Sequence, residues 1–285
     1  MKLTAADAVQ RLLTRAPGQT PADVLAGMQD LLAPDLDEVG VLAALDSLSE
    51  GVETTGEVVY PQYSGLAPNS QQARLGAAMV VVRRTALDRQ GRTSAHTRTV
   101  DVRLSVVDGA WRVTGVPSVG GQPVARPAEV SPAAARVLDN PLVDLPDTAR
   151  WDVHAGLVAD DLLDLVAMAA DLGPVSVTVM ATGHPREVFN TVTVSAHTAG
   201  RAVDLWRIDR LDVVDDRGPT GPLARLQAAA LASERTSQVG GPPGTDVDGP
   251  GSRRSFMDRV HDDHLHLAVL PEGAPPYLAP TAPAG

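Results

Sequence analysis

Two stretches of the sequence, Ser195-Ala-His-Thr-Ala-Gly-Arg-Ala-Val-Asp204 and His261-Asp-Asp-His-Leu-His266, contain four of the seven histidines of the chain. In the second stretch and just beyond it, histidines alternate with Leu265 and Leu267. Side chains two residues apart lie on the same face of a β-strand. The alternation therefore predicts a strand over residues 265–270, with imidazoles on one face and leucines in the core.

The first stretch leads into another strand of this kind, expected at residues 202–208. Ala202, Asp204 and Trp206 would share one of its faces. A carboxylate between an alanine and a tryptophan is partly desolvated, which costs free energy unless it is paired or bound to a cation. The chain has no cysteine, so histidines and carboxylates would have to hold any metal ion. Two imidazoles and one carboxylate give zinc three ligands and leave the fourth position open, as in catalytic zinc sites.

The rest of the second half is predicted to be α+β. Residues 157–172 combine acidic residues in the first turns, a stripe of Leu, Val and Ala, and a closing Gly-Pro pair, which predicts a helix. The remaining expected elements are strands at residues 175–181 and 191–195, a helix at 222–234 and an irregular Gly/Pro-rich loop at 240–254.

The first half is also predicted to be α+β, with helices followed by a curved antiparallel sheet. The spacing of apolar residues predicts two or three short helices within residues 5–31 and 36–49. Strand-like runs follow at residues 56–60, 74–87, 93–107 and 110–116. This order is compatible with a cone of the nuclear transport factor 2 type, an analogy of fold that implies no function.

A Gly/Pro-rich stretch separates the two halves and predicts two domains. The expected domains are residues 1–122, of unknown role, and residues 133–272. They would be joined by a linker at 123–132, and residues 273–285 would form a loose tail.

Composition excludes several classes of function. Of the 285 residues, 44% are apolar and 21% are charged, as in globular proteins, and the formal charge is −11. This acidity disfavours nucleic acid, because phosphate binding needs clustered Lys and Arg. No apolar run is long enough to span a membrane. Residues 1–17 lack the basic and apolar regions of a secretory signal.

The pattern Ser-x-His-x-x-Gly-x-Ala-x-Asp, followed by carboxylate-x-x-His, resembles the zinc D-Ala-D-Ala dipeptidases and carboxypeptidases, whose fold hedgehog domains share. The resemblance covers about residues 150–270. It implies an α+β metallopeptidase domain with a central antiparallel sheet. It also implies one zinc ion per chain, with His197, Asp204 and His266 as its ligands.

The same resemblance assigns roles to four further residues. The general base of the family stands three residues before the last ligand, which implies Asp263; the family usually has glutamate there, and His261 is the other candidate for the base. His264 corresponds to a histidine that helps stabilise the oxyanion in murein endopeptidases, or it orients a neighbouring ligand. Arg186, in Ala181-Thr-Gly-His-Pro-Arg186, corresponds to an arginine that contacts substrate.

The expected function is hydrolysis of peptide bonds in peptidoglycan-derived peptides by a zinc-activated water. The alternative is a zinc-containing, catalytically silent domain that binds peptidoglycan or protein. The resemblance implies a place in the cell envelope or outside the cell, whereas the lack of a readable signal leaves the cytoplasm open. The sequence predicts neither the bond that is cleaved nor the oligomeric state.

Overall fold

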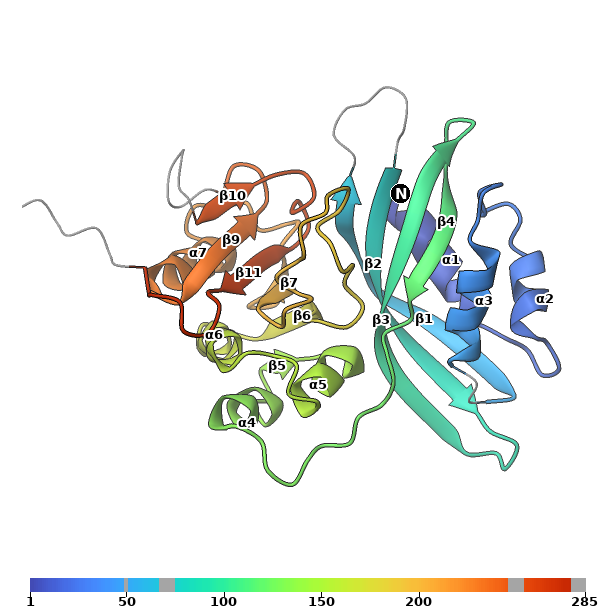
Figure 1. Ribbon diagram of the computed structural model, residues 1–285, viewed down its shortest axis with the longest axis horizontal. Helices are drawn as coiled ribbons and strands as arrows, with labels where there is room; N and C mark the ends of the chain where they lie inside the picture. The colour runs from blue at the N-terminus through green and yellow to red at the C-terminus, as the bar shows by residue number, and fades with distance from the viewer. Residues whose placement is uncertain (49–50, 67–74, 246–253, 278–285) are drawn as a thin grey trace, which may run out of the picture.

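The computed structural model describes residues 1–48, 51–66, 75–245 and 254–277. These residues form a mixed α+β structure with a four-stranded antiparallel sheet in the first half and a second, mixed sheet in the second half (Figure 1). Each sheet has its own set of buried apolar side chains. The predicted division into domains at residues 123–132 stays a prediction; residues 119–131 contain no helix or strand.

The first sheet has the strand order β1-β2-β3-β4, in which every neighbouring pair is antiparallel. Three helices cover one of its faces (Figure 1). The elements are α1 (Lys2–Leu12), α2 (Pro21–Ala26), α3 (Glu38–Asp46), β1 (Glu53–Leu66), β2 (Leu75–Leu87), β3 (Thr93–Val107) and β4 (Ala110–Ser118).

The central strand β2 is buried on both faces, which explains its nearly continuous apolar sequence. Ala78, Val80 and Val82 pack with the helices on one side. Val81, on the opposite side, packs with Tyr60 of β1 and Trp206 of the second sheet. The rings of Tyr60 and Trp206 stack with their centroids 4.5 Å apart. The first sheet is therefore a layer between its own helices and the second half of the chain.

The second sheet has the order β10-β9-β11-β7-β6-β5, and β8 pairs with β7. Its central strands are antiparallel, as expected, but both edge pairs, β10-β9 and β5-β6, are parallel. The strands are β5 (Val143–Asp144), β6 (Val175–Val179), β7 (Ala202–Ile208), β8 (Leu211–Asp212), β9 (Thr236–Gly241), β10 (Ser255–Met257) and β11 (Leu265–Val269).

The helices of the second half pack against the apolar face of this sheet. In α6 the acidic residues Asp160 and Asp161 lie in the first turn, where the helix dipole favours them, and the stripe from Leu162 to Ala170 is buried. The four helices are α4 (Pro132–Leu138), α5 (Asp147–His154), α6 (Asp160–Asp171) and α7 (Pro222–Ala232).

One predicted strand, residues 191–195, is wrong. The segment forms only an isolated bridge between Glu187 and Val194, and Val192 is 96% exposed. Its alternation of Thr and Val resembles a strand, but backbone hydrogen bonds hold it only to the short segment 186–188, and Val192 and Val194 stay exposed, so among the described residues no apolar face stabilises a strand here. Part of the predicted loop 240–254 belongs to β9, and residues 246–253 lie outside the described residues. The predicted tail has no helix or strand up to residue 277, beyond which it is not described.

In the part of the chain that the structure describes, no helix is both long enough and apolar enough to cross a membrane.

Candidate metal centre

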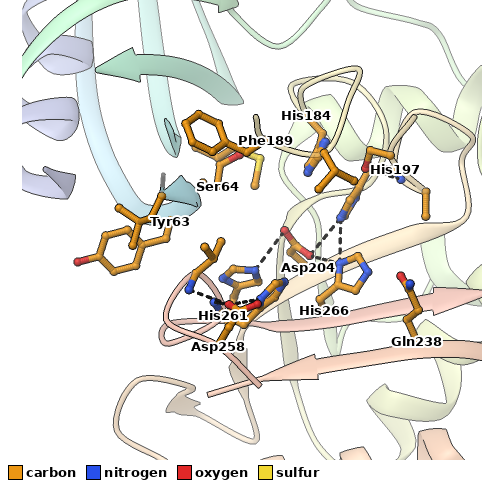
Figure 2. A pocket seen from close by; sticks show the side chains of 18 of the residues that line it. Tyr63, Ser64, His184, Phe189, His197, Asp204, Gln238, Asp258, His261 and His266 are labelled. Atoms are coloured by element: carbon orange, nitrogen blue, oxygen red, sulfur yellow. Dashed lines mark hydrogen bonds and ion pairs between the residues drawn. The ribbon is translucent and has the colours of Figure 1, made fainter. Parts of the chain in front are cut away.

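The side chains of His197, Asp204 and His266 point toward one another (Figure 2). Asp204 lies on β7 and His266 on β11, and the antiparallel register pairs these two residues directly. Directly paired residues project to the same face of a sheet, as the alternation in both strands predicts. His197 comes from the turn that precedes β7. The structure thus brings the three predicted ligands together.

The turn that carries His197 depends on Gly200. This glycine has φ +66°, and its backbone NH donates a hydrogen bond of 2.8 Å to the carbonyl of His197. A Cβ atom at Gly200 would lie 1.8 Å from the carbonyl oxygen of Leu157. No side chain fits this position without moving the backbone.

Gly200→Ala is therefore expected to lower the free energy of unfolding of the metal-free protein by at least about 2 kcal/mol, through left-handed strain and the backbone clash together. Gly156→Ala is the matched control, because Gly156 has φ +67° and open space around the added Cβ. Gly156→Ala should lower the free energy of unfolding only by the left-handed strain, about 1 kcal/mol. Thermal unfolding would measure both, and equal losses would contradict the role of close packing at Gly200.

The three ligand atoms form a compact triangle. Nε2 of His197 lies 3.2 Å from Oδ1 of Asp204 and 3.2 Å from Nδ1 of His266, and the distance between Oδ1 and Nδ1 is 3.0 Å. With zinc bonds of 2.0–2.1 Å, the edges of a regular tetrahedron are about 3.3 Å. All three residues are buried, and two imidazole nitrogens with one carboxylate oxygen are ligands typical of catalytic zinc. The residues therefore fit a zinc ion.

Two neighbours orient His197. Its Nδ1 donates a hydrogen bond of 2.7 Å to the carbonyl oxygen of Met180, which leaves Nε2 facing the triangle. The ring of His184 stacks on the ring of His197, with the centroids 4.1 Å apart. Nδ1 of His184 donates to the carbonyl of Pro185 at 2.7 Å.

The electrostatics of the site favour the protonation states that a cation needs. Burial, opposed by Asp204, lowers the pKa of His266 to about 4, which leaves this imidazole neutral at pH 7. Burial also lowers the pKa of His184 well below its usual value. For Asp204, burial opposes ionisation, but attraction to His197 and His264 holds the pKa well below the usual value. A neutral imidazole and an ionised carboxylate are the forms that bind metal.

The triangle lies at the base of a pocket of about 300 Å³. Both halves of the chain line this pocket: Tyr63 and Ser64 belong to the first sheet, and Phe189 to the second half (Figure 2). Met79 of the first sheet and Phe256 of the second half line it as well. His261, His264 and Asp258 also line it. The walls are largely apolar, and the polar groups converge at the ligands.

His261 forms a pair with Asp258. Nδ1 of His261 lies 2.7 Å from Oδ1 of Asp258, so it donates and leaves Nε2 for other partners. Burial opposes ionisation of Asp258, but the hydrogen bond and charge of His261 lower its pKa to about 2. The His261 ring lies near the triangle, with its centroid 5.7 Å from that of His266. A histidine oriented by a carboxylate is a common arrangement for a general base.

Asp263 lies beside this group, but not in the pocket among the described residues. Its carboxylate is fully buried and bonds to three partners: Nζ of Lys2 at 2.5 Å, the backbone NH of Tyr63 at 3.1 Å, and Nδ1 of His264 at 2.9 Å. It therefore anchors His264 and joins the two halves of the chain.

The fixed Nδ1 of His264 leaves its Nε2 on the side of the ligands, 3.7 Å from Oδ2 of Asp204. Burial lowers the pKa of His264, but Asp204 and Asp263 outweigh it and the net pKa is raised. His264 thus lies beside the predicted ligand Asp204, and its role in stabilising an oxyanion or orienting a ligand stays a prediction.

The structure does not bring Arg186 to this group. Its side chain is 77% exposed and pairs with Glu187 at 3.8 Å. Its carbonyl instead accepts hydrogen bonds from the backbone of Ser195 and the hydroxyl of Thr198. Contact between Arg186 and a substrate stays a prediction, which this arrangement does not support.

Among the described residues around the site, sequence reasoning missed Lys2, Gln62, His184 and Asp258 in particular. Lys2 and Gln62 carry no local signal, because they reach the site from the other half of the chain. Asp258 had a local signal, because it stands three residues before His261, a spacing that lets a carboxylate bond to the ring.

Comparisons with known proteins add little. No protein-family model and no curated protein matches the chain. Among solved structures, a periplasmic fragment of TraM is similar, with a TM-score of 0.36 and 9% identity; the match covers 41% of this chain and 93% of the fragment. Likeness at this level carries no argument about fold or function.

Proposed function

We propose that this chain is a zinc-dependent peptidase in which His197, Asp204 and His266 hold one zinc ion. The observation that carries the proposal is the triangle of ligand atoms, 3.0–3.2 Å apart, at the base of a pocket with a second histidine–carboxylate pair. When bound, the zinc would polarise the scissile carbonyl and lower the pKa of a water to about 7.

The fold is part of this proposal. The second half would be a metallopeptidase domain of the D-Ala-D-Ala peptidase type, because its central strands β7 and β11 present Asp204 and His266 from one face. The first half would be of the nuclear transport factor 2 type, because helices cover one face of an antiparallel sheet whose register shifts bend it.

His261 is the proposed general base. It lines the pocket beside the ligands, whereas the Asp263 carboxylate is buried and engaged by three partners. Asp258 accepts a hydrogen bond from Nδ1, which leaves Nε2 to take a proton from the attacking water. Asp263, which stands where the family usually has its base, would thus anchor His264 in this chain.

His264 is proposed to stabilise the negative charge that develops on the carbonyl oxygen. Asp263 fixes its orientation through Nδ1, so Nε2 can donate toward the base of the pocket. A positioned donor of this kind acts most strongly in a site from which water is excluded.

The substrate class follows from the resemblance of the two histidine stretches to cell-wall peptidases. The pocket is small and largely apolar beyond the ligands, which suits a short peptide with small side chains. A peptidoglycan-derived peptide would meet these conditions. The protein would then act in the cell envelope or outside the cell.

The test is digestion of purified peptidoglycan by the zinc-loaded protein, with release of soluble muropeptides as the readout. Release that stops on chelation and returns with zinc would support the proposal. Zinc-loaded protein that releases nothing, from either intact or pre-solubilised peptidoglycan, would overturn the peptidase function.

His261→Ala is expected to lower kcat by about 10²–10⁴-fold, the usual contribution of a general base, while zinc content stays at one per chain. His96→Ala serves as a control, since His96 pairs with Asp147 and does not line the pocket. Elemental analysis and initial rates on a soluble muropeptide measure both quantities. Full activity in His261→Ala would rule out this base.

A second candidate function rests on Asp263. The carboxylate of Asp263, at the position expected for the base, is buried and forms an ion pair with Lys2. In this second function the domain would hold zinc and bind peptidoglycan without cleaving it. Zinc-dependent co-sedimentation with peptidoglycan, without muropeptide release, would favour this binding role over the peptidase.

A further inference from the structure

Gln62 reaches the candidate metal centre from the other half of the chain. It lies on β1 of the first sheet and is fully buried. Its Nε2 donates a hydrogen bond of 2.6 Å to Oδ2 of Asp204, which lies on β7 of the second sheet. A residue from outside the predicted metallopeptidase domain therefore contacts a predicted ligand directly.

The two oxygens of Asp204 have separate partners. Oδ1 faces Nε2 of His197 and Nδ1 of His266, at 3.2 and 3.0 Å. Oδ2 accepts the hydrogen bond of Gln62 and has Nε2 of His264 3.7 Å away. Only Oδ1 therefore points at the centre of the triangle, and the hydrogen bond of Gln62 holds the carboxylate in this rotation.

The amide of Gln62 can take only one orientation. The reverse orientation would place its oxygen 2.6 Å from a carboxylate oxygen, which is repulsive, so the NH₂ group must face Asp204. Its Oε1 is then buried with no hydrogen-bond partner among the described residues. A buried carbonyl without a partner is unfavourable to folding, so it offsets part of what the hydrogen bond to Asp204 contributes to stability.

We propose that Gln62 is a positioning residue of the metal centre. It restricts Asp204 to coordination through Oδ1 alone and so makes the first sheet a working part of the site. The inference rests on the zinc site of the proposed function, but not on hydrolysis. Groups that bond to metal ligands in this way typically change metal affinity 10–100-fold.

The first sheet also forms a wall of the same pocket. Tyr63, Ser64, Gly65 and Leu66 follow Gln62 on β1, and Met79 lies on the neighbouring strand β2. Strand β1 therefore contributes both the hydrogen bond to the ligand and a surface that a bound peptide would touch. The two halves are inferred to form one centre, rather than a peptidase with an attached module.

Gln62→Leu tests the inference, because leucine fills similar space and cannot donate. The zinc affinity of the full chain, measured by competition with a chromophoric chelator, should fall by at least about tenfold. The visible spectrum of the Co²⁺-loaded variant should weaken, because a carboxylate freed to bind through both oxygens raises the coordination number above four. A loss of packing alone would leave that spectrum unchanged.

Tyr60→Phe is the matched control. The hydroxyl of Tyr60 also donates a 2.6 Å hydrogen bond between the two halves, but to the backbone carbonyl of Asp263. Zinc affinity and the Co²⁺ spectrum should stay at wild-type values in this variant. Wild-type affinity and spectrum in Gln62→Leu would overturn the inference, and so would an equal loss of affinity in Tyr60→Phe.

The outcomes also separate the inference from the proposed function. Weaker zinc binding in Gln62→Leu, together with no muropeptide release by the wild type, supports the inference and overturns the peptidase. Muropeptide release by the wild type, with unchanged zinc binding in Gln62→Leu, supports the peptidase and overturns the inference. A wild-type protein that binds no zinc overturns the inference along with the metal site.

Discussion

Replacing His197 with alanine is expected to abolish both zinc binding and hydrolysis. The substitution removes one of three ligand atoms and leaves Oδ1 of Asp204 and Nδ1 of His266, 3.0 Å apart, without a third metal ligand among the described residues. Loss of a group that only orients a ligand lowers metal affinity 10–100-fold. Loss of the ligand itself should therefore lower zinc affinity by more than about 100-fold. Elemental analysis of the purified variant would show well under one zinc per chain.

His154→Ala is the control for this experiment. His154 lies at the end of α5, where its Nδ1 donates to the carbonyl of Val124, and it does not line the pocket. This variant should keep one zinc and full activity. A His197→Ala protein that keeps stoichiometric zinc would contradict the assignment of the metal centre. Retained zinc with lost hydrolysis would move His197 from ligand to substrate contact.

Two of the three ligands could be predicted from the alternation of side chains along a strand. Asp204 and His266 lie on strands whose alternation fixes the face of every side chain, and a residue's face follows from its neighbours in sequence. Their direct pairing could not be read from alternation, because the register of two strands depends on packing between segments far apart in sequence.

The wrong strand at residues 191–195 shows the limit of the same reasoning. Its residues alternate as well as those of β11, yet Val192 and Val194 are exposed, whereas Leu265 and Leu267 are buried. Alternation describes a chain that can form a strand, but a partner strand decides whether it does. Likewise, the contacts of Lys2 and Gln62 with the second half could not be predicted, because nothing in the sequence near either residue specifies a partner 261 or 142 residues away.

Replacing Lys2 with methionine is expected to destabilise the protein strongly. The Asp263 carboxylate is fully buried, and Lys2, the single lysine of the chain, supplies its charged partner at 2.5 Å. Lys2 lies in the first turn of α1, where the helix dipole disfavours a cation, so its position there is explained by the ion pair and not by the helix. Removing one partner of a buried pair costs about 3–5 kcal/mol. Since Lys2 is 23% exposed, we expect about 3 kcal/mol in urea unfolding of the metal-free protein.

Two further variants identify the cause of this loss. Adding Asp263→Asn to Lys2→Met removes the stranded charge, so the double variant should be more stable than Lys2→Met alone. Arg126→Met breaks a bidentate but exposed ion pair with Asp139 and should cost no more than about 1 kcal/mol. Equal losses in Lys2→Met and Arg126→Met would mean that solvent screens the Lys2–Asp263 pair. The two halves of the chain would then be held together by their other contacts, among them the Tyr60–Trp206 stack and the hydrogen bond from Gln62 to Asp204.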